Sequence, residues 1–80
     1  DFFISATKYE LKSITGARGV STNVKQSMRR GQSDRFVIDG RRSGLTAEHL
    51  DKELDSLARD GYFPSEVIAI LKDGAIVYRP

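Results

Sequence analysis

The stretch that decides the fold runs from residue 35 to residue 46 and reads RFVIDGRRSGLT. It begins as a strand over residues 35–39, in which Phe36 and Ile38 share one face. It continues through a loop with a glycine at each end, GRRSG, and reaches Thr46, a good N-cap for the helical pattern that follows. The stretch therefore predicts a strand that ends in polar and charged side chains just before a helix N-terminus.

The residues downstream of this stretch predict one helix and one hairpin. Leucines recur at helical spacing after Thr46, acidic residues crowd the first turns, and Gly61 ends the pattern. SEVIAILK, residues 65–72, is a strong strand pattern, and Asp73-Gly74 is the dipeptide typical of a two-residue type I′ turn. AIVYR, residues 75–79, is the returning strand.

Two more helices are predicted upstream. The region from residue 2 to residue 15 favours a helix, because Leu11 and Ile14 lie three apart and Gly16 would end it. STNVKQSMRRG, residues 21–31, offers Ser21 or Thr22 as N-cap and Gly31 as terminator.

These elements predict a single α+β domain over residues 1–80. Its core is a small antiparallel or mixed three-stranded sheet, with the N-terminal helices and one crossover helix packed on it. The chain has no cysteine, so it has neither a disulfide nor a thiolate metal site. No apolar run reaches the length of a membrane span, so we expect no membrane anchor in this segment.

Charge is unevenly distributed along the chain. Residues 1–46 hold nine Lys and Arg against four acids, whereas residues 47–80 hold four against seven. This asymmetry suggests one face suited to a polyanion, the alternative being an ordinary mixture of solvated charges. Metal and cofactor chemistry is poorly supported, because His49 is the single histidine and neither a P-loop nor a dinucleotide motif occurs.

With metal and cofactor chemistry set aside, the polar residues of the opening stretch suit a metal-free attack on a phosphodiester. Asp39 could orient a group or accept a proton, and Arg41 and Arg42 could hold a phosphate. Thr46 and the helix that it begins form an anion site, and His49 could shuttle a proton. We therefore take Asp39, Arg41, Thr46 and His49 as the candidate catalytic residues.

A basic track is the second candidate feature. Lys25, Arg29 and Arg30 lie close together on the predicted helix 21–31 and, with Arg42, would bind RNA phosphates if that helix lies beside the loop. Each candidate also has a purely structural interpretation. Asp39 could cap the turn at Gly40, Thr46 could act only as an N-cap, His49 could be a surface residue, and the basic helix face could simply be solvated.

A family resemblance adds to these patterns. Gln32 and Asp34, then FVIDGRRSGLT, then PSEVIAILKDGAIVY over residues 64–78 resemble the tRNA-nuclease toxin domains of bacterial contact-dependent growth inhibition proteins. The resemblance spans about residues 24–80. Carried over by position, it implies site roles for Asp39, Arg41 and Thr46, and it assigns no general base or acid in the N-terminal half.

The resemblance also implies a function and partners. Domains of this family have folds compared with barnase, colicin nucleases and RelE, and many are ribonucleases that need no metal or other cofactor. They form the C-terminal part of large surface effectors, are delivered into the target cell and are neutralised by a cognate immunity protein. We therefore expect a tRNA-cleaving toxin domain, excised from a longer chain, whose immunity protein is acidic. The alternative is a non-catalytic RNA- or protein-binding module with the same basic face.

Overall fold

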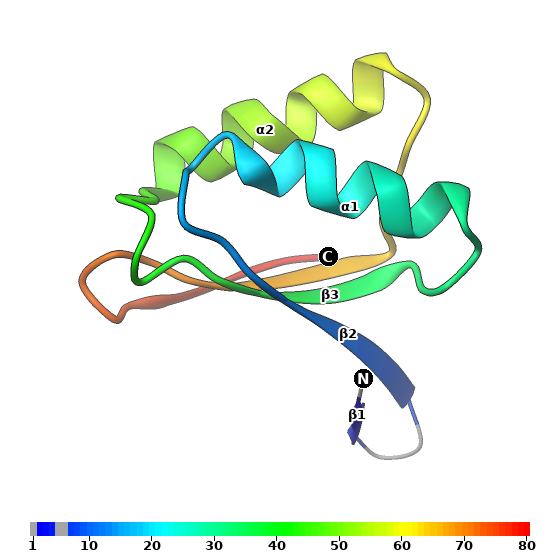
Figure 1. The fold of residues 1–80 in the computed structure, drawn as a ribbon, viewed down its shortest axis with the longest axis horizontal. Coiled ribbons are helices and arrows are strands. Elements are labelled where there is room, and N and C mark those ends of the chain that lie inside the picture. Colours follow the sequence, from blue (N-terminus) through cyan, green and yellow to red (C-terminus); the bar gives the residue numbers. More distant parts are fainter. Residues whose placement is uncertain (1, 5–6) are drawn as a thin grey trace.

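Five strands form one sheet in the order β1-β2-β3-β4-β5, and two helices cover one of its faces (Figure 1). The structure is a computed structural model that describes residues 2–4 and 7–80. Along the chain the elements are β1 (Phe2–Ile4), β2 (Thr7–Ser13), α1 (Gly19–Arg29), β3 (Arg35–Asp39), α2 (Ala47–Arg59), β4 (Glu66–Ile70) and β5 (Ile76–Arg79). The α+β class is confirmed, and the sheet is mixed, one of the two predicted types, but it has five strands instead of the three predicted.

β3 is the central strand because it pairs in parallel with β2 on one side and with β4 on the other. Its alternating pattern buries Phe36 and Ile38 completely under the helices. In register with them, β4 contributes Val67 and Ala69 to the same core. The helices add apolar side chains to the same cluster: Val20 and Val24 from α1, Leu50 and Leu57 from α2.

The helix predicted upstream of Gly16 is wrong. Residues 7–13 form β2, which pairs in parallel with β3, and residues 2–4 form β1, which pairs antiparallel with β2. The spacing of Leu11 and Ile14 suggested a helix. In the fold, however, Ile14 joins the core and Leu11 lies half-exposed on the opposite face. Pairing with a strand more than twenty residues away overrides this weak local signal.

α1 also begins earlier than predicted. It starts at Gly19, with Arg18 at the N-cap and no side-chain cap. Ser21 therefore does not cap the helix. Its backbone N–H and its hydroxyl donate to Glu53 Oε1 on α2, at 3.1 and 3.0 Å, and so join the two helices. Gly31, with a φ of 69°, ends the helix as predicted.

The turn between β4 and β5 is longer than a two-residue type I′ turn. The backbone N–H of Gly74 donates to Leu71 O at 2.9 Å, and the N–H of Leu71 donates to Ala75 O at 2.7 Å. Three residues therefore form the loop, with Gly74 in the left-handed region at a φ of 87°. Over residues 2–4 and 7–80, neither helix is long and apolar enough to cross a membrane.

Gly40 makes the tightest backbone approach in the fold. A Cβ there would lie 2.6 Å from Leu45 Cδ2 and 2.9 Å from Ile70 O. Because the carbonyl belongs to a paired strand and Leu45 is completely buried, neither neighbour can move away freely. We expect Gly40→Ala to lower the free energy of unfolding by about 1–3 kcal/mol, measured by urea denaturation.

Gly16→Ala is the matched control. A Cβ at Gly16 meets nothing within 4 Å. This variant should unfold within about 0.5 kcal/mol of the parent. Equal unfolding midpoints for the two variants would show that the chain around Gly40 is packed less closely than described.

Candidate active site on the open face of the sheet

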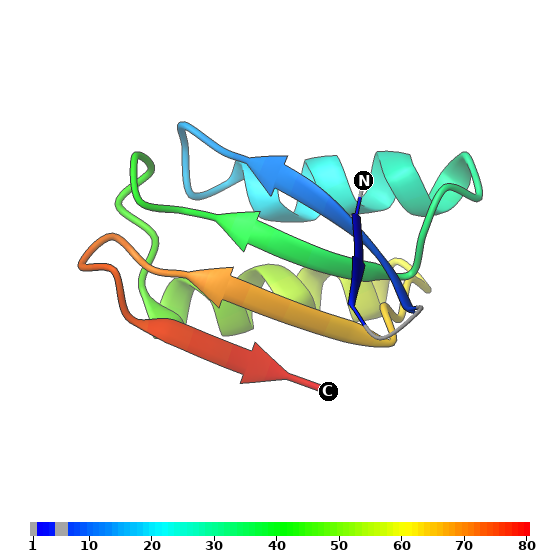
Figure 2. The ribbon, with the colours of Figure 1, turned by 90° about the horizontal axis from the view of Figure 1, so that it is seen from below.

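The face of the sheet opposite the helices carries two groups of polar side chains. Figure 2 looks onto this face, which we call the open face, with both helices behind the sheet and β1 crossing in front of it. On β3, Arg35 and Asp39 alternate with the buried Phe36 and Ile38 and so point to this open face. In the register of β3 and β4, Arg35 lies beside Glu66. The alternation of buried and exposed side chains along β3 therefore determines which charged groups lie on the open face.

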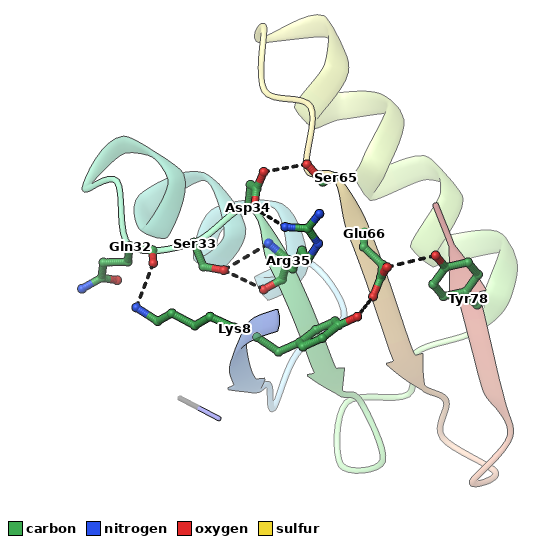
Figure 3. Close-up of polar contacts among 9 residues, drawn as sticks. Lys8, Gln32, Ser33, Asp34, Arg35, Ser65, Glu66 and Tyr78 are labelled. Carbon is green, nitrogen blue, oxygen red and sulfur yellow. Dashed lines mark hydrogen bonds and ion pairs between the residues drawn. The ribbon is translucent and has the colours of Figure 1, made fainter. Parts of the chain in front are cut away.

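Glu66 is held between two tyrosine hydroxyls. Tyr9, on β2, donates to Glu66 Oε1, and Tyr78, on β5, donates to Glu66 Oε2 at 3.0 Å (Figure 3). The hairpin of β4 and β5, together with the distant strand β2, thus brings one carboxylate and two phenols together. Tyr9 is buried, whereas Tyr78 is 51% exposed and can meet a ligand.

The tyrosines remain protonated around neutral pH. The hydrogen bond to Glu66, then burial, and then the negative charge of Glu66 raise the pKa of both Tyr9 and Tyr78. The positive charge of Arg35 opposes this shift at both residues without reversing it. Tyr9 and Tyr78 are therefore hydrogen-bond donors, and Glu66 is the acceptor.

Arg35 provides the cation of this cluster. Its Nη1 lies 3.5 Å from Asp34 Oδ1, and its backbone N–H donates to Ser33 Oγ at 3.1 Å. Asp34 in turn accepts a hydrogen bond from Ser65 Oγ at 2.6 Å. These contacts fix the start of β3, and Figure 3 shows the guanidinium between Asp34 and Glu66. We call Tyr9, Arg35, Glu66 and Tyr78 the tyrosine–glutamate cluster.

A second polar feature lies at the other end of β3. A cavity of about 210 Å³ opens where the parallel strands β2 and β3 end. Its lining consists of Ser13, Ile14, Thr15, Asp39, Arg41 and Arg42. The cavity thus contains three of the residues predicted from the sequence, and we call it the strand-end cavity. Carboxyl ends of parallel strands are a common place for ligands in α/β sheets.

Arg41 forms a two-point ion pair with Asp39 inside the strand-end cavity. Arg41 Nε and Nη2 donate to the two carboxylate oxygens at 2.9 and 2.8 Å, and the Arg41 backbone N–H donates at 3.2 Å. These hydrogen bonds, together with the charges of Arg41 and Arg42, lower the pKa of Asp39 to about 2 against an opposing effect of burial. An aspartate so firmly ionised is a poor proton acceptor.

The ion pair of Asp39 and Arg41 predicts a loss of stability in acid. Because the folded-state pKa of Asp39 is depressed, the pair's contribution to stability is complete above the ordinary pKa of 3.8 and is lost as the pH falls toward 2. NMR titration of the Asp39 side-chain carboxyl should give a midpoint near 2 in the parent and a higher value in Arg41→Gln. Arg59→Gln, on α2, is the control and should leave the midpoint unchanged. A parent midpoint near 3.8 would mean that the pair does not form in solution.

Thr46 and His49 do not join Asp39 and Arg41. Thr46 caps α2 by accepting from the His49 backbone N–H at 3.1 Å, and it borders a different cavity beside Leu71 and Lys72. Among the described residues His49 Nε2 has no hydrogen-bond partner and is buried, and His49 does not line the strand-end cavity. The structure therefore does not bring these two residues together with Asp39 and Arg41 at one cavity.

The basic residues of α1 do not extend the strand-end cavity either. α1 lies on the covered face of the sheet (Figure 1), and Lys25 and Arg29 line a separate hollow between the two helices. Lys25 Nζ there forms an ion pair with Asp60 at 2.6 Å. Arg30 is the C-cap residue of α1 and is exposed. Of the four residues predicted to bind RNA, Arg42 alone borders the strand-end cavity.

The tyrosine–glutamate cluster is absent from the sequence prediction. Arg35, Glu66 and Tyr78 contribute there only to strand patterns, and Tyr9 falls in the helix that was wrongly predicted. One signal was present: in β4 a charged Glu66 precedes an otherwise apolar run and shares the open face with Ile68 and Ile70. Across residues 2–4 and 7–80, no group of three or more His, Cys, Asp or Glu side chains could hold a metal ion. Comparison of the chain with protein-family models, curated proteins and solved structures gives no match.

Proposed function

We propose that this protein is a ribonuclease that cleaves RNA by attack of the ribose 2′-hydroxyl and needs no metal. The observation that supports the proposal is a carboxylate, Glu66, hydrogen-bonded to two tyrosine hydroxyls beside the guanidinium of Arg35. This chemistry requires a base for the 2′-hydroxyl proton, an acid for the leaving oxygen and a cation for the phosphorane charge. The tyrosine–glutamate cluster contains all three groups.

The proposed reaction proceeds as follows. Glu66 takes the proton of the 2′-hydroxyl, and the 2′-oxygen forms a bond to phosphorus while the bond from phosphorus to the 5′-oxygen breaks. Tyr78, the exposed phenol, gives its proton to the leaving 5′-oxygen, and Arg35 stabilises the charge on the phosphoryl oxygens. The products are a 2′,3′-cyclic phosphate and a 5′-hydroxyl. The protonated Glu66 can then return a proton to the Tyr78 phenolate along their 3.0 Å contact.

The substrate and partner in this proposal come from the family resemblance of residues 24–80. We propose tRNA as the substrate, delivery of the domain into target bacteria as part of a larger effector, and neutralisation by an acidic immunity protein. The excess of Lys and Arg in residues 1–46 supports an anionic partner.

The test is incubation of the purified protein with total tRNA, once in magnesium and once in excess EDTA. Shortened tRNA in both samples supports the proposal, as does growth arrest when the chain is expressed in bacteria. A non-catalytic binding module would retard tRNA in a gel without shortening it, and this outcome would overturn the proposal.

A further inference from the structure

The tyrosine–glutamate cluster and the strand-end cavity lie at opposite ends of one strand and on one face. Arg35 and Asp39 are four residues apart on β3, which corresponds to about 13 Å at the rise of a strand. Neighbouring phosphates of a nucleotide strand lie closer together than this. A single phosphate therefore cannot contact both sites, but a strand of several nucleotides can.

The surface between the two sites is suited to contact the riboses and bases of a nucleotide strand. Leu11, Val37 and Ile68 lie side by side in the registers of β2, β3 and β4 and share the open face. Leu11 is 49% exposed, and the other two are partly exposed. Riboses and bases can pack on such an apolar strip, while their phosphates need cations at its ends.

The strand-end cavity supplies donors for an anion. Two arginines, Arg41 and Arg42, and two hydroxyl-bearing residues, Ser13 and Thr15, line the cavity together with one carboxylate residue, Asp39. The Arg41 side chain is 61% exposed, so its outer edge remains accessible while it is bound to Asp39. With two positive charges against one negative charge, the cavity keeps a net charge of about +1 at neutral pH. Arginine also matches the geometry of phosphate oxygens.

We propose that the strand-end cavity is a second phosphate-binding subsite, which holds an internucleotide phosphate of the same RNA strand that is cut at the tyrosine–glutamate cluster. Asp39 positions the Arg41 guanidinium across the cavity, and Arg42 contributes the unbalanced charge. The motif DGRRSG thereby binds substrate away from the reacting atoms. This inference rests on the proposed function for the identity of the strand as RNA.

Salt dependence of tRNA binding tests the subsite. Removing one cation that binds a phosphate should reduce the slope of log affinity against log salt concentration by about one. We expect Arg42→Gln to show this change, together with a roughly tenfold weaker affinity for tRNA. Arg59→Gln, which removes an exposed arginine from the last turn of α2 on the covered side, is the control and should keep the parent slope.

The two proposals can fail separately in this experiment. If tRNA is cut but Arg42→Gln keeps the parent slope and affinity, the subsite is refuted and the ribonuclease is not. If Arg42→Gln lowers the slope but the parent protein never shortens tRNA, the phosphate site stands and the proposed function is refuted. Because Arg42 is an exposed loop residue, the variant should fold, and its thermal unfolding midpoint verifies this.

Discussion

Glu66→Gln should slow the single-turnover cleavage of tRNA by a factor of about 10²–10⁴, the usual contribution of a general base. The substitution removes the group that takes the 2′-hydroxyl proton and changes the shape of the side chain little. The amide oxygen of glutamine can still accept a hydrogen bond from Tyr9 or Tyr78, so the three strands should remain joined. The thermal unfolding midpoint, measured on the same sample, separates loss of catalysis from loss of fold.

Glu48→Gln is the matched control for this prediction. Glu48 lies in the first turn of α2, its side chain is 82% exposed, and it forms an ion pair with Lys52 on the same helix. The control should therefore cleave at the parent rate. A folded Glu66→Gln protein that cleaves as fast as the control would remove Glu66 from the mechanism.

Arg35→Gln should have the second largest effect, a decrease in rate of about 10²–10³-fold. Arg35 is paired with Glu66 in the register of β3 and β4, and its positive charge reaches both phenols, since it acts to lower the pKa of Tyr9 and of Tyr78. Arg35→Lys keeps the charge but loses the planar set of donors, and it should restore part of the rate.

The rates and unfolding midpoints of the Arg35 variants distinguish a structural role of Arg35 from a catalytic one. If Arg35 only fixes the strand through Asp34, then Arg35→Gln and Arg35→Lys should lower the unfolding midpoint and the rate together. A direct role in catalysis predicts a rate loss in Arg35→Gln with little change in the midpoint. Equal rates for the parent and a folded Arg35→Gln would contradict that role.

The sequence predicted the helices and strands that depend on a short run of neighbouring residues. β3, α2 and β4 follow from short alternating or helical patterns and from Thr46, which caps α2 as predicted. β2 was missed because the spacing of Leu11 and Ile14 was taken as helical, although Tyr9 and Leu11 also alternate with charged residues as in a strand. The pairing with β3, from Glu10↔Phe36 to Ser13↔Asp39, decides between the two. The longer β4–β5 loop was missed for a related reason, since Asp73-Gly74 fits both turn types.

In the candidate site, too, residues close together in the sequence were predicted, and residues brought together by the sheet were not. Asp39, Arg41 and Arg42 lie within four residues, so their proximity could be predicted from one motif. Tyr9 and Glu66 are 57 residues apart, and they meet because β2 and β4 both flank β3. The prediction for His49 assumed that a residue one turn into α2 faces the preceding loop. The helix instead leaves His49 half-buried, with its Nε2 atom shielded from solvent.

In the proposed reaction the ribose 2′-hydroxyl is the nucleophile and Glu66 is its base. The most direct measurement is analysis of the ends of the tRNA fragments made in excess EDTA, by mass spectrometry of the product mixture. The mechanism predicts a 2′,3′-cyclic phosphate on one fragment and a 5′-hydroxyl on the other, and neither product at a comparable rate with Glu66→Gln. Fragments that carry a 3′-hydroxyl and a 5′-phosphate would show that water is the nucleophile and would contradict this account of the open face.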